Sequence, residues 1–215
     1  MFPGLSGGWT IGCTRGILHY QYSQVKVRIV RADAKIRRQK IIDAACALFR
    51  STPDSAVTLE AIAARAGVGI ATLYRNFPTR QDLDVACGIQ MLTDIGLLIS
   101  ELRANFHADP TKQWEEFVWK LLDLGAWPLA AAIASEDLTR EPELAATRRE
   151  TIQAFQAVLD LAAPAGLVPR DLTPVEFAEE IFVVTRPLGG KLGEHHPDVQ
   201  PRLVRRLLTA WKATS

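Results

Sequence analysis

Apolar residues recur at helical spacing along most of this chain, and the most informative stretch is residues 58 to 77, TLEAIAARAGVGIATLYRNF. Thr58 is placed to cap a helix by accepting a hydrogen bond from a backbone N–H one turn in. Val57 and Ile62 occupy the positions of a hydrophobic staple over that cap. The apolar side chains that follow have the i, i+3, i+4, i+7 spacing of one buried helix face: Leu59, Ile62, Ala63 and Ala66.

Gly67 predicts the end of this first helix, because a chain that reverses through a left-handed residue favours glycine, which has no Cβ. Val68 is apolar within the turn, so we expect it to fill the space between two helices. The second helix, residues 70–76, has Leu73 as its one clear core residue and is followed by Phe77. Two short helices joined by a glycine turn predict helix-turn-helix geometry, which is a DNA-reading unit.

This stretch resembles the tetracycline-repressor (TetR) family of one-component regulators. The resemblance begins in the preceding helix, at Arg38, Ile41, Ile42, Ala44, Ala45, Leu48 and Phe49. It continues past the second helix, through Phe77, Pro78, Arg80, Asp82 and Leu83. It implies an N-terminal three-helix DNA-binding domain followed by a helical domain that senses a ligand and forms a dimer.

By resemblance, Thr58, Tyr74 and Arg80 match the contacts that the family makes to the DNA backbone. Arg80, near the start of the next helix, also adds charge to the positive end of that helix. The alternative is that Tyr74 packs against the protein and Arg80 is solvated.

The chain departs from the family where the recognition helix begins, because Gly69, Ile70 and Ala71 replace a serine, a polar residue and a glycine. Gly69 is a weaker cap than serine by only about a few tenths of a kcal/mol, so we expect the helix to form. Ile70, Ala71 and the methyl group of Thr72 can contact the C5-methyl of thymine. If Ile70 instead faces inward, sequence preference depends largely on DNA shape. Polar readout of guanine and adenine is left to two residues at the end of the helix, Arg75 and Asn76.

Charge is distributed unevenly along the chain, although the net charge of the whole is only +1. Residues 1–81 carry 12 Lys and Arg against 4 Asp and Glu, and residues 82–215 carry 13 against 20. The two parts therefore have net charges of +8 and −7. Together with the motif, this asymmetry favours a basic module that contacts phosphate and an acidic body that stays off the DNA.

The composition favours a cytoplasmic protein. Cys13, Cys46 and Cys87 are odd in number and contain no CxxC, which is typical of a reducing compartment. We expect Cys46 and Cys87 to be small buried side chains. No apolar run approaches the ~20 residues of a membrane span, and the N-terminus lacks the pattern of a secretory signal.

Residues 1–32 contain no acidic residue, five of the 14 glycines and the basic run VKVRIVR. Three interpretations stay open: a disordered basic arm, a short strand, or upstream sequence translated from a misassigned start codon. We expect an extension that does not pack on the domain; a basic arm could reach a minor groove. The expected division is residues 1–32 as the extension, 33–94 as the DNA-binding domain and 95–215 as the effector-binding and dimerisation domain.

Helical spacing continues from residue 80 to the end of the chain, and no strand pattern rivals it, so the expected fold class is all-α. Thr79 with Asp82, and Thr173 with Glu176, form capping pairs at two helix starts. Pro187 must kink or end the helix that Thr173 begins. Prolines suited to the first turn of a helix mark other starts: Pro110, Pro142 and Pro174.

In the family, the last two long helices pair with a symmetry mate as a four-helix bundle. The corresponding helices here are more apolar than a monomer surface needs, and operator half-sites favour proteins with two-fold symmetry. The alternative is that the same residues close the core of the monomer. The candidate dimer-interface residues are Phe177, Ile181, Val184, Leu203, Leu207 and Trp211.

Several aromatic residues at helical spacing are candidates for lining an effector pocket, although plain core is the alternative: Phe106, Trp114, Phe117, Trp127 and Phe155. Adjacent His195 and His196 cannot easily both point inward, so we expect no metal site. We expect no cofactor.

Enzyme motifs are missing: GGKLG at residues 189–193 lacks the spacing of a phosphate loop, and there is no GxSxG or HExxH. The sequence therefore favours a homodimeric repressor that binds a palindromic double-stranded DNA operator and is released by a small, largely apolar effector. The alternative is a helix-turn-helix protein without a ligand, acting as an architectural or partner-recruited repressor.

Overall fold

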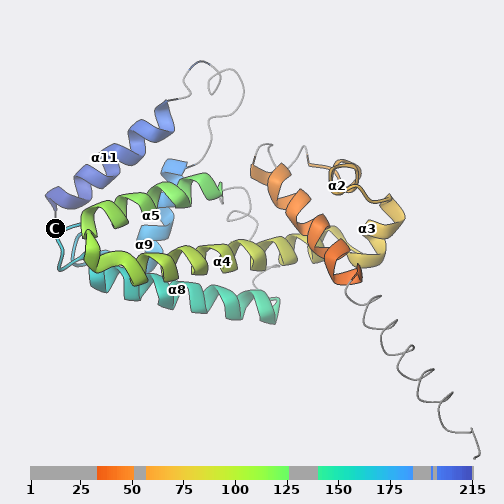
Figure 1. Cartoon of the computed structure of the whole chain (residues 1–215), viewed down its shortest axis with the longest axis horizontal. Coiled ribbons are helices and arrows are strands. Elements are labelled where there is room, and N and C mark those ends of the chain that lie inside the picture. The colour runs from red at the N-terminus through yellow and green to blue at the C-terminus, as the bar shows by residue number, and fades with distance from the viewer. Residues whose placement is uncertain (1–32, 51–56, 126–139, 186–194, 196–197, 215) are drawn as a thin grey trace, which may run out of the picture. The chain divides into compact units, whose positions relative to one another are not determined.

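The structure, a computed structural model, describes residues 33–50, 57–125, 140–185, 195 and 198–214 of the 215-residue chain. The described residues form helices and contain no strand, which confirms the all-α prediction (Figure 1). Residues 41–215 form one compact unit and residues 1–40 another. The expected domain boundaries after residues 32 and 94 stay predictions.

The helix-turn-helix follows a helix over residues 33–50 and consists of α2 (Leu59–Ala66) and α3 (Ile70–Asn76). Thr58 caps α2 by accepting a hydrogen bond from the Ala61 N–H at 3.2 Å. Gly67 ends α2 in the left-handed region, with φ of 67°. The predicted cap and the predicted glycine turn are both confirmed.

The helix-turn-helix has a core that is closed to solvent. Each of its helices contributes side chains to that core, and Val68 in the turn is partly buried against it as predicted. Phe77, at the end of α3, and Leu83, in the next helix, continue the same core. The fully buried residues of this region are Ile41, Ile62, Leu73, Phe77 and Leu83.

The long helix α4 (Arg80–Asn105) connects the helix-turn-helix to the rest of the chain. The predicted capping box is present at its start, because Thr79 and Asp82 each accept a hydrogen bond from the other's backbone N–H. A short 3-10 helix, η2 (Phe106–Ala108), follows, and then α5 (Pro110–Leu124). Pro110 occupies the first turn of α5, as expected.

Three further helices complete the described body: α8 (Pro142–Ala162), α9 (Pro174–Thr185) and α11 (Val199–Ala213). Thr173 and Glu176 form the predicted capping box of α9, with the Thr173 N–H donating to Glu176 Oε2 at 3.0 Å. These hydrogen bonds from the backbone and the hydroxyl of Thr173 lower the pKa of the Glu176 carboxyl. Pro187 lies outside the described residues.

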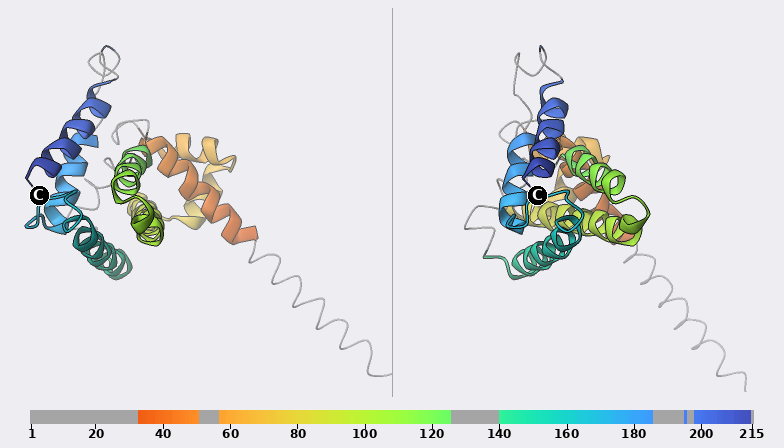
Figure 2. Two further views of the ribbon diagram at one scale, coloured as in Figure 1. Left: turned by 60° about the vertical axis from the view of Figure 1, so that its left-hand side comes forward. Right: turned by 90° about the vertical axis from the view of Figure 1, so that its left-hand side faces the viewer.

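The body packs around α4 and α9. Helix α8 lies along α4, and α5 packs on α4 as well (Figure 1). Helix α9 contacts α5, α8 and α11, and α11 stays beside α9 in the views of Figure 2. This arrangement makes α9 the helix around which the aromatic core of the body is built.

Helix α4 contains a longer apolar stretch than we expected from the sequence. By length and composition alone, Arg80–Ala108 would suffice to cross a membrane, contrary to the expectation that no apolar run is long enough. Part of this run is buried, including Met91, Leu92, Ile95 and Ile99, and α4 packs against α5 and α8, whereas Leu97 is 65% exposed. The length of this run therefore reflects a helix that is covered on more than one side.

Some predictions fall on residues that the structure does not describe. They concern the extension over residues 1–32, Cys13, the pocket candidate Trp127, and His196. His195 is described and exposed. Among the described residues there is no group of three His, Cys, Asp or Glu side chains that could hold a metal ion.

Candidate nucleic-acid interface

The two faces of α3 have opposite character. Leu73 in its middle is fully buried, as is Phe77 directly after it. Tyr74 is 46% exposed, and Ala71 is exposed as well. Ile70 precedes Leu73 by three residues and Phe77 by seven, so it lies at the edge of the buried face, where it is 38% exposed. Helix α3 therefore presents an apolar and aromatic outer surface of the size that a major groove admits.

The polar residues of α3 are joined by hydrogen bonds within the helix. Arg75 Nη2 donates to Thr72 Oγ1 at 2.9 Å, and Asn76 Nδ2 donates to the Thr72 carbonyl at 2.8 Å. Reading adenine with asparagine requires Nδ2 to donate to the base. The amide nitrogen carries two hydrogens and this bond uses one, so the adenine contact of the half-buried Asn76 stays a prediction.

The starts of the two helices differ in how they are capped. Thr58 is exposed and accepts from the first turn of α2. Gly69 caps α3 without a side chain, and its carbonyl accepts from the Thr72 and Leu73 N–H groups at 2.8 and 3.2 Å. The helix forms despite the missing serine, as expected. Because Gly69 has no side chain, nothing at this position keeps a DNA phosphate away from the backbone N–H groups at the start of α3.

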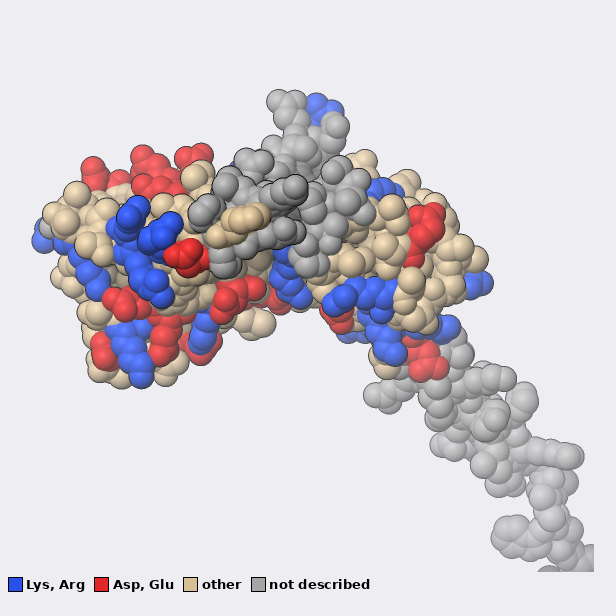
Figure 3. Space-filling view, turned by 90° about the horizontal axis from the view of Figure 1, so that it is seen from above, with Lys and Arg blue, Asp and Glu red and all other residues tan. Residues whose placement is uncertain are grey.

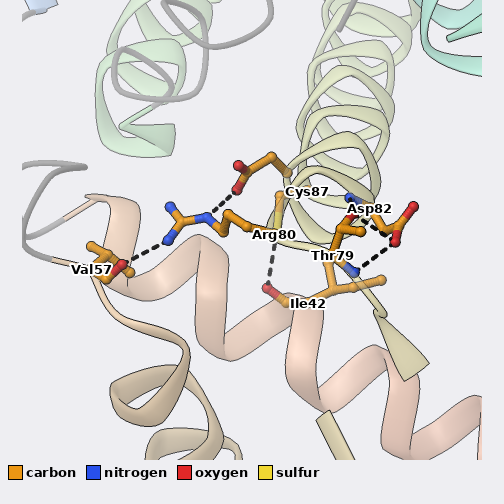
Figure 4. A network of polar contacts seen from close by, with 7 residues as sticks. Ile42, Val57, Thr79, Arg80, Asp82 and Cys87 are labelled. Carbon is orange, nitrogen blue, oxygen red and sulfur yellow. Dashed lines mark hydrogen bonds and ion pairs between the residues drawn. The ribbon is translucent and has the colours of Figure 1, made fainter. Parts of the chain in front are cut away.

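Arg80 has a different environment from the one that the sequence suggested. Its Nε donates to Asp84 Oδ1 at 2.8 Å and its Nη1 donates to the Val57 carbonyl at 2.7 Å (Figure 4). Its guanidinium also lies 5.0 Å from the centre of the Phe49 ring. These contacts hold the side chain against the protein, and the predicted phosphate contact of Arg80 stays a prediction.

Cys87 lies beside this network, with Sγ 4.0 Å from the Ile42 carbonyl (Figure 4). A hydrogen bond with Cys46 and burial both raise the pKa of the Cys87 thiol. The same hydrogen bond lowers the pKa of Cys46, which is partly exposed. Cys87 is a small buried side chain as predicted, whereas Cys46 is only partly so.

The described residues up to residue 81 carry an excess of positive charge, with 8 Lys and Arg against 3 Asp and Glu in residues 33–50 and 57–81. In the view of Figure 3, Asp and Glu side chains lie mostly over the helical body, but Lys and Arg side chains lie among them there as well as over the other end. A basic surface around an exposed recognition helix suits the phosphate backbone of DNA.

The pocket candidates that the structure describes are packed against one another. Trp114 lies 5.7 Å from both Phe117 and Phe177, and Phe155 lies 5.3 Å from Phe177, measured between ring centres. Phe106 is buried at the end of α4. These residues form an aromatic core, which was the alternative interpretation. Trp114 Nε1 within it is buried, and among the residues that the structure describes it has no hydrogen-bond partner.

A hollow of about 260 Å³ lies elsewhere, along the first half of α8. Apolar side chains and two arginines line it, and none of them was among the pocket candidates: Leu144, Ala145, Arg148, Arg149 and Ile152. All five lie on one helix, within a plain amphipathic pattern, so no sequence signal marks them as a site.

The dimer-interface candidates divide into two groups. Phe177, Ile181 and Trp211 are buried within the chain itself, so their proposed place on an interface was wrong. Val184 and Leu207 are partly buried and Leu203 is exposed. The exposed apolar side chains of α9 are on its other face, at Val175 and Val183.

Comparisons with known proteins agree with the helix-turn-helix geometry. Residues 41–87 match the family of bacterial regulatory proteins called the tetR family. The structure is similar to the TetR transcriptional regulator SCO0520 from Streptomyces coelicolor, with 25% sequence identity and a TM-score of 0.57, covering 81% of this chain and 97% of that chain.

Two mycobacterial structures are similar as well. LfrR from Mycobacterium smegmatis, a TetR-like transcriptional regulator in complex with proflavine, has 25% identity and a TM-score of 0.57, covering 84% of this chain and 97% of that chain. A TetR regulatory protein from Mycobacterium vanbaalenii has 24% identity and a TM-score of 0.53, covering 85% and 98%. None of the curated proteins matches the chain in sequence.

Proposed function

We propose that the chain, a TetR-family transcriptional regulator that binds DNA, is a homodimeric repressor released from a palindromic operator by a small, largely apolar effector. The observation that carries the proposal is the exposed surface of α3 outside its buried Leu73, which includes Ala71 and Tyr74 and has Ile70 at its edge. Because its target is DNA, we place the protein in the cytoplasm.

Dimerisation is proposed through an apolar face on α9 and α11. We define this α9–α11 face by Val175 and Val183 of α9 and by Leu203 and Leu207 of α11. Val175, Val183 and Leu203 are 51%, 68% and 38% exposed, and a surface patch of several apolar side chains is a feature of protein interfaces. A two-fold dimer places the same face on both subunits and presents two recognition helices to two half-sites.

The effector is proposed to bind in the body, at or beside the aromatic core. LfrR holds proflavine, a planar aromatic molecule, so an aromatic environment is a reasonable site by analogy. Trp114 supports this location, because its buried indole N–H has no acceptor within the described part of the chain, and a ligand with one acceptor atom would satisfy it. We therefore expect a largely apolar effector that carries at least one hydrogen-bond acceptor.

Release follows from linkage between the two sites. A dimer bound to DNA must hold its recognition helices about 34–36 Å apart, or a multiple of this, to meet successive faces of the major groove. An effector that binds more tightly to a dimer with another spacing of the recognition helices lowers the affinity of the protein for DNA. By linkage, DNA lowers the affinity of the protein for the effector by the same factor. Helix α4 is suited to transmit the change, because it begins at the helix-turn-helix and packs against α5 and α8.

Base reading by methyl contact gives the test of the proposed recognition helix. Ile70 and Ala71 are exposed on α3 and carry no hydrogen-bonding group, so we expect thymines opposite residues 70–72 in each half-site. Replacing such a thymine by uracil deletes only the methyl group, and the expected loss is about 1 kcal/mol per important position. Fluorescence anisotropy with matched thymine and uracil duplexes measures it.

The matched control is uracil substitution outside the half-sites, which should leave affinity unchanged. Equal affinity for both duplexes at the positions opposite residues 70–72 would reject methyl readout. The same measurement on an Ile70→Ala variant checks the assignment, because the uracil effect should shrink when the isoleucine is truncated.

A further inference from the structure

Arg80 joins three elements of the DNA-binding region. It lies in the first turn of α4, and its Nε donates to Asp84 Oδ1 one turn further along that helix. Its Nη1 reaches back 23 residues to the Val57 carbonyl, directly before the Thr58 cap of α2. The guanidinium also covers the ring of Phe49 in the helix over residues 33–50.

We propose that Arg80 is a positioning residue, which fixes the start of the helix-turn-helix to the start of α4, and that Asp84 holds it in place. The inference rests on the proposed DNA-binding function and names a residue that transmits the position of α4 to α2. Figure 4 shows the guanidinium between Val57 and the start of α4, with the two hydrogen bonds leaving it in different directions.

The chemistry of the guanidinium suits this task. It is planar, and its N–H donors have a fixed relative geometry, so two bonds from one group set both a distance and an angle. A lysine ammonium keeps the charge but holds no such geometry. The pair is also partly shielded, because the Arg80 and Asp84 side chains are 32% and 19% exposed, so solvent screens it less than an open surface pair.

The same contacts argue against a main role on phosphate. Asp84 lies at 2.8 Å and offsets the positive charge of Arg80. A phosphate contact gains affinity through release of a counterion, and it acts on all sequences alike. A positioning residue instead sets how well α3 fits its own operator, so its loss should affect specific binding more than non-specific binding.

The two roles predict opposite signs for Asp84. If charge alone mattered, removing this carboxylate near the DNA would strengthen binding. If Asp84 holds Arg80 in place, removing it weakens binding although the protein becomes more basic. Asp94 is the matched control, because it is another α4 aspartate whose carboxylate accepts from Gln90 of the same helix.

The experiment measures affinity against salt concentration for the full-length wild type and for Arg80→Ala, Arg80→Lys, Asp84→Ala and Asp94→Ala. The probes are a duplex recovered by wild-type selection from a random pool, and an unselected random duplex. We expect Arg80→Ala and Asp84→Ala to bind the selected duplex about tenfold more weakly, as the loss of one hydrogen bond to a charged group predicts. Arg80→Lys should be weakened as well, and Asp94→Ala should not.

In every variant we expect the slope of log affinity against log salt concentration to equal that of the wild type. Affinity for the unselected duplex should change little. Tighter binding by Asp84→Ala, or a slope shallower by about one unit in Arg80→Ala, would overturn the proposal in favour of a phosphate contact. A lowered melting temperature with unchanged affinity of the folded protein would overturn it in favour of a purely structural role. Failure of the wild type to prefer any duplex would count against the proposed function instead.

Discussion

Replacing both Val183 and Leu203 by glutamate should give a monomer that keeps its helices and loses tight operator binding. Both side chains are exposed on the α9–α11 face, so the change leaves the core of the chain intact. Four glutamates would meet across a two-fold interface and stay unpaired, which strongly opposes association. Operator affinity should fall about a hundredfold or more, because each half-site is then bound without the other.

Sedimentation velocity gives the oligomeric state of this variant, circular dichroism its helical content, and anisotropy its affinity. Leu97→Glu is the matched control, because Leu97 is also exposed, at 65%, but lies on α4 outside the proposed face. The control should remain a dimer. An intact dimer in the Val183→Glu, Leu203→Glu variant would refute the proposed interface.

Trp211→Ala should destabilise the fold by about 3–5 kcal/mol, as expected when a large aromatic side chain is removed from a packed core. Trp211 is 3% exposed, and its ring centre lies 5.5 Å from that of Phe177 and 6.1 Å from that of Trp114. Its Nε1 donates to Glu180 Oε2 at 2.7 Å. The truncation leaves both a cavity and a carboxylate without its donor.

Urea unfolding at a fixed protein concentration measures this effect, since the stability of a dimer depends on concentration. Trp211→Phe separates the two contributions: it keeps an aromatic ring and should cost about 1–3 kcal/mol for the lost hydrogen bond to a charged group. Each of these two variants, if it remains folded, should still be a dimer. A Trp211→Ala protein that is stable within about 0.5 kcal/mol of the wild type but monomeric would return this residue to the interface.

The sequence was sufficient where a local signal decides the structure. Threonines at residues 58, 79 and 173 cap helices as predicted, and Gly67 ends α2 with positive φ. Each of these depends on hydrogen bonds or dihedral angles within a few residues. The partial exposure of Ile70 needed the structure, because its spacing to Leu73 and Phe77 alone would place it on the buried face.

The sequence was insufficient where the partner of a residue lies far along the chain. Apolar spacing showed that one face of α9 is covered, but not whether its cover is α11 or a second subunit, so Phe177 and Trp211 were assigned to the wrong surface. The contacts of Arg80 within the protein were not predicted for the same reason, since its acceptor at Val57 is 23 residues away. The hollow on α8 has no motif at all.

The central claim is that α3 reads DNA sequence as part of a dimer, and selection from a random duplex pool tests it most directly. Full-length protein is incubated with the pool at near-physiological salt, and the bound duplexes are recovered and sequenced. The account predicts an inverted repeat, with half-site centres about 10–10.5 base pairs or a multiple apart and with thymines at corresponding positions in both halves. Recovered duplexes without a shared sequence, bound with an affinity that depends on salt alone, would contradict it.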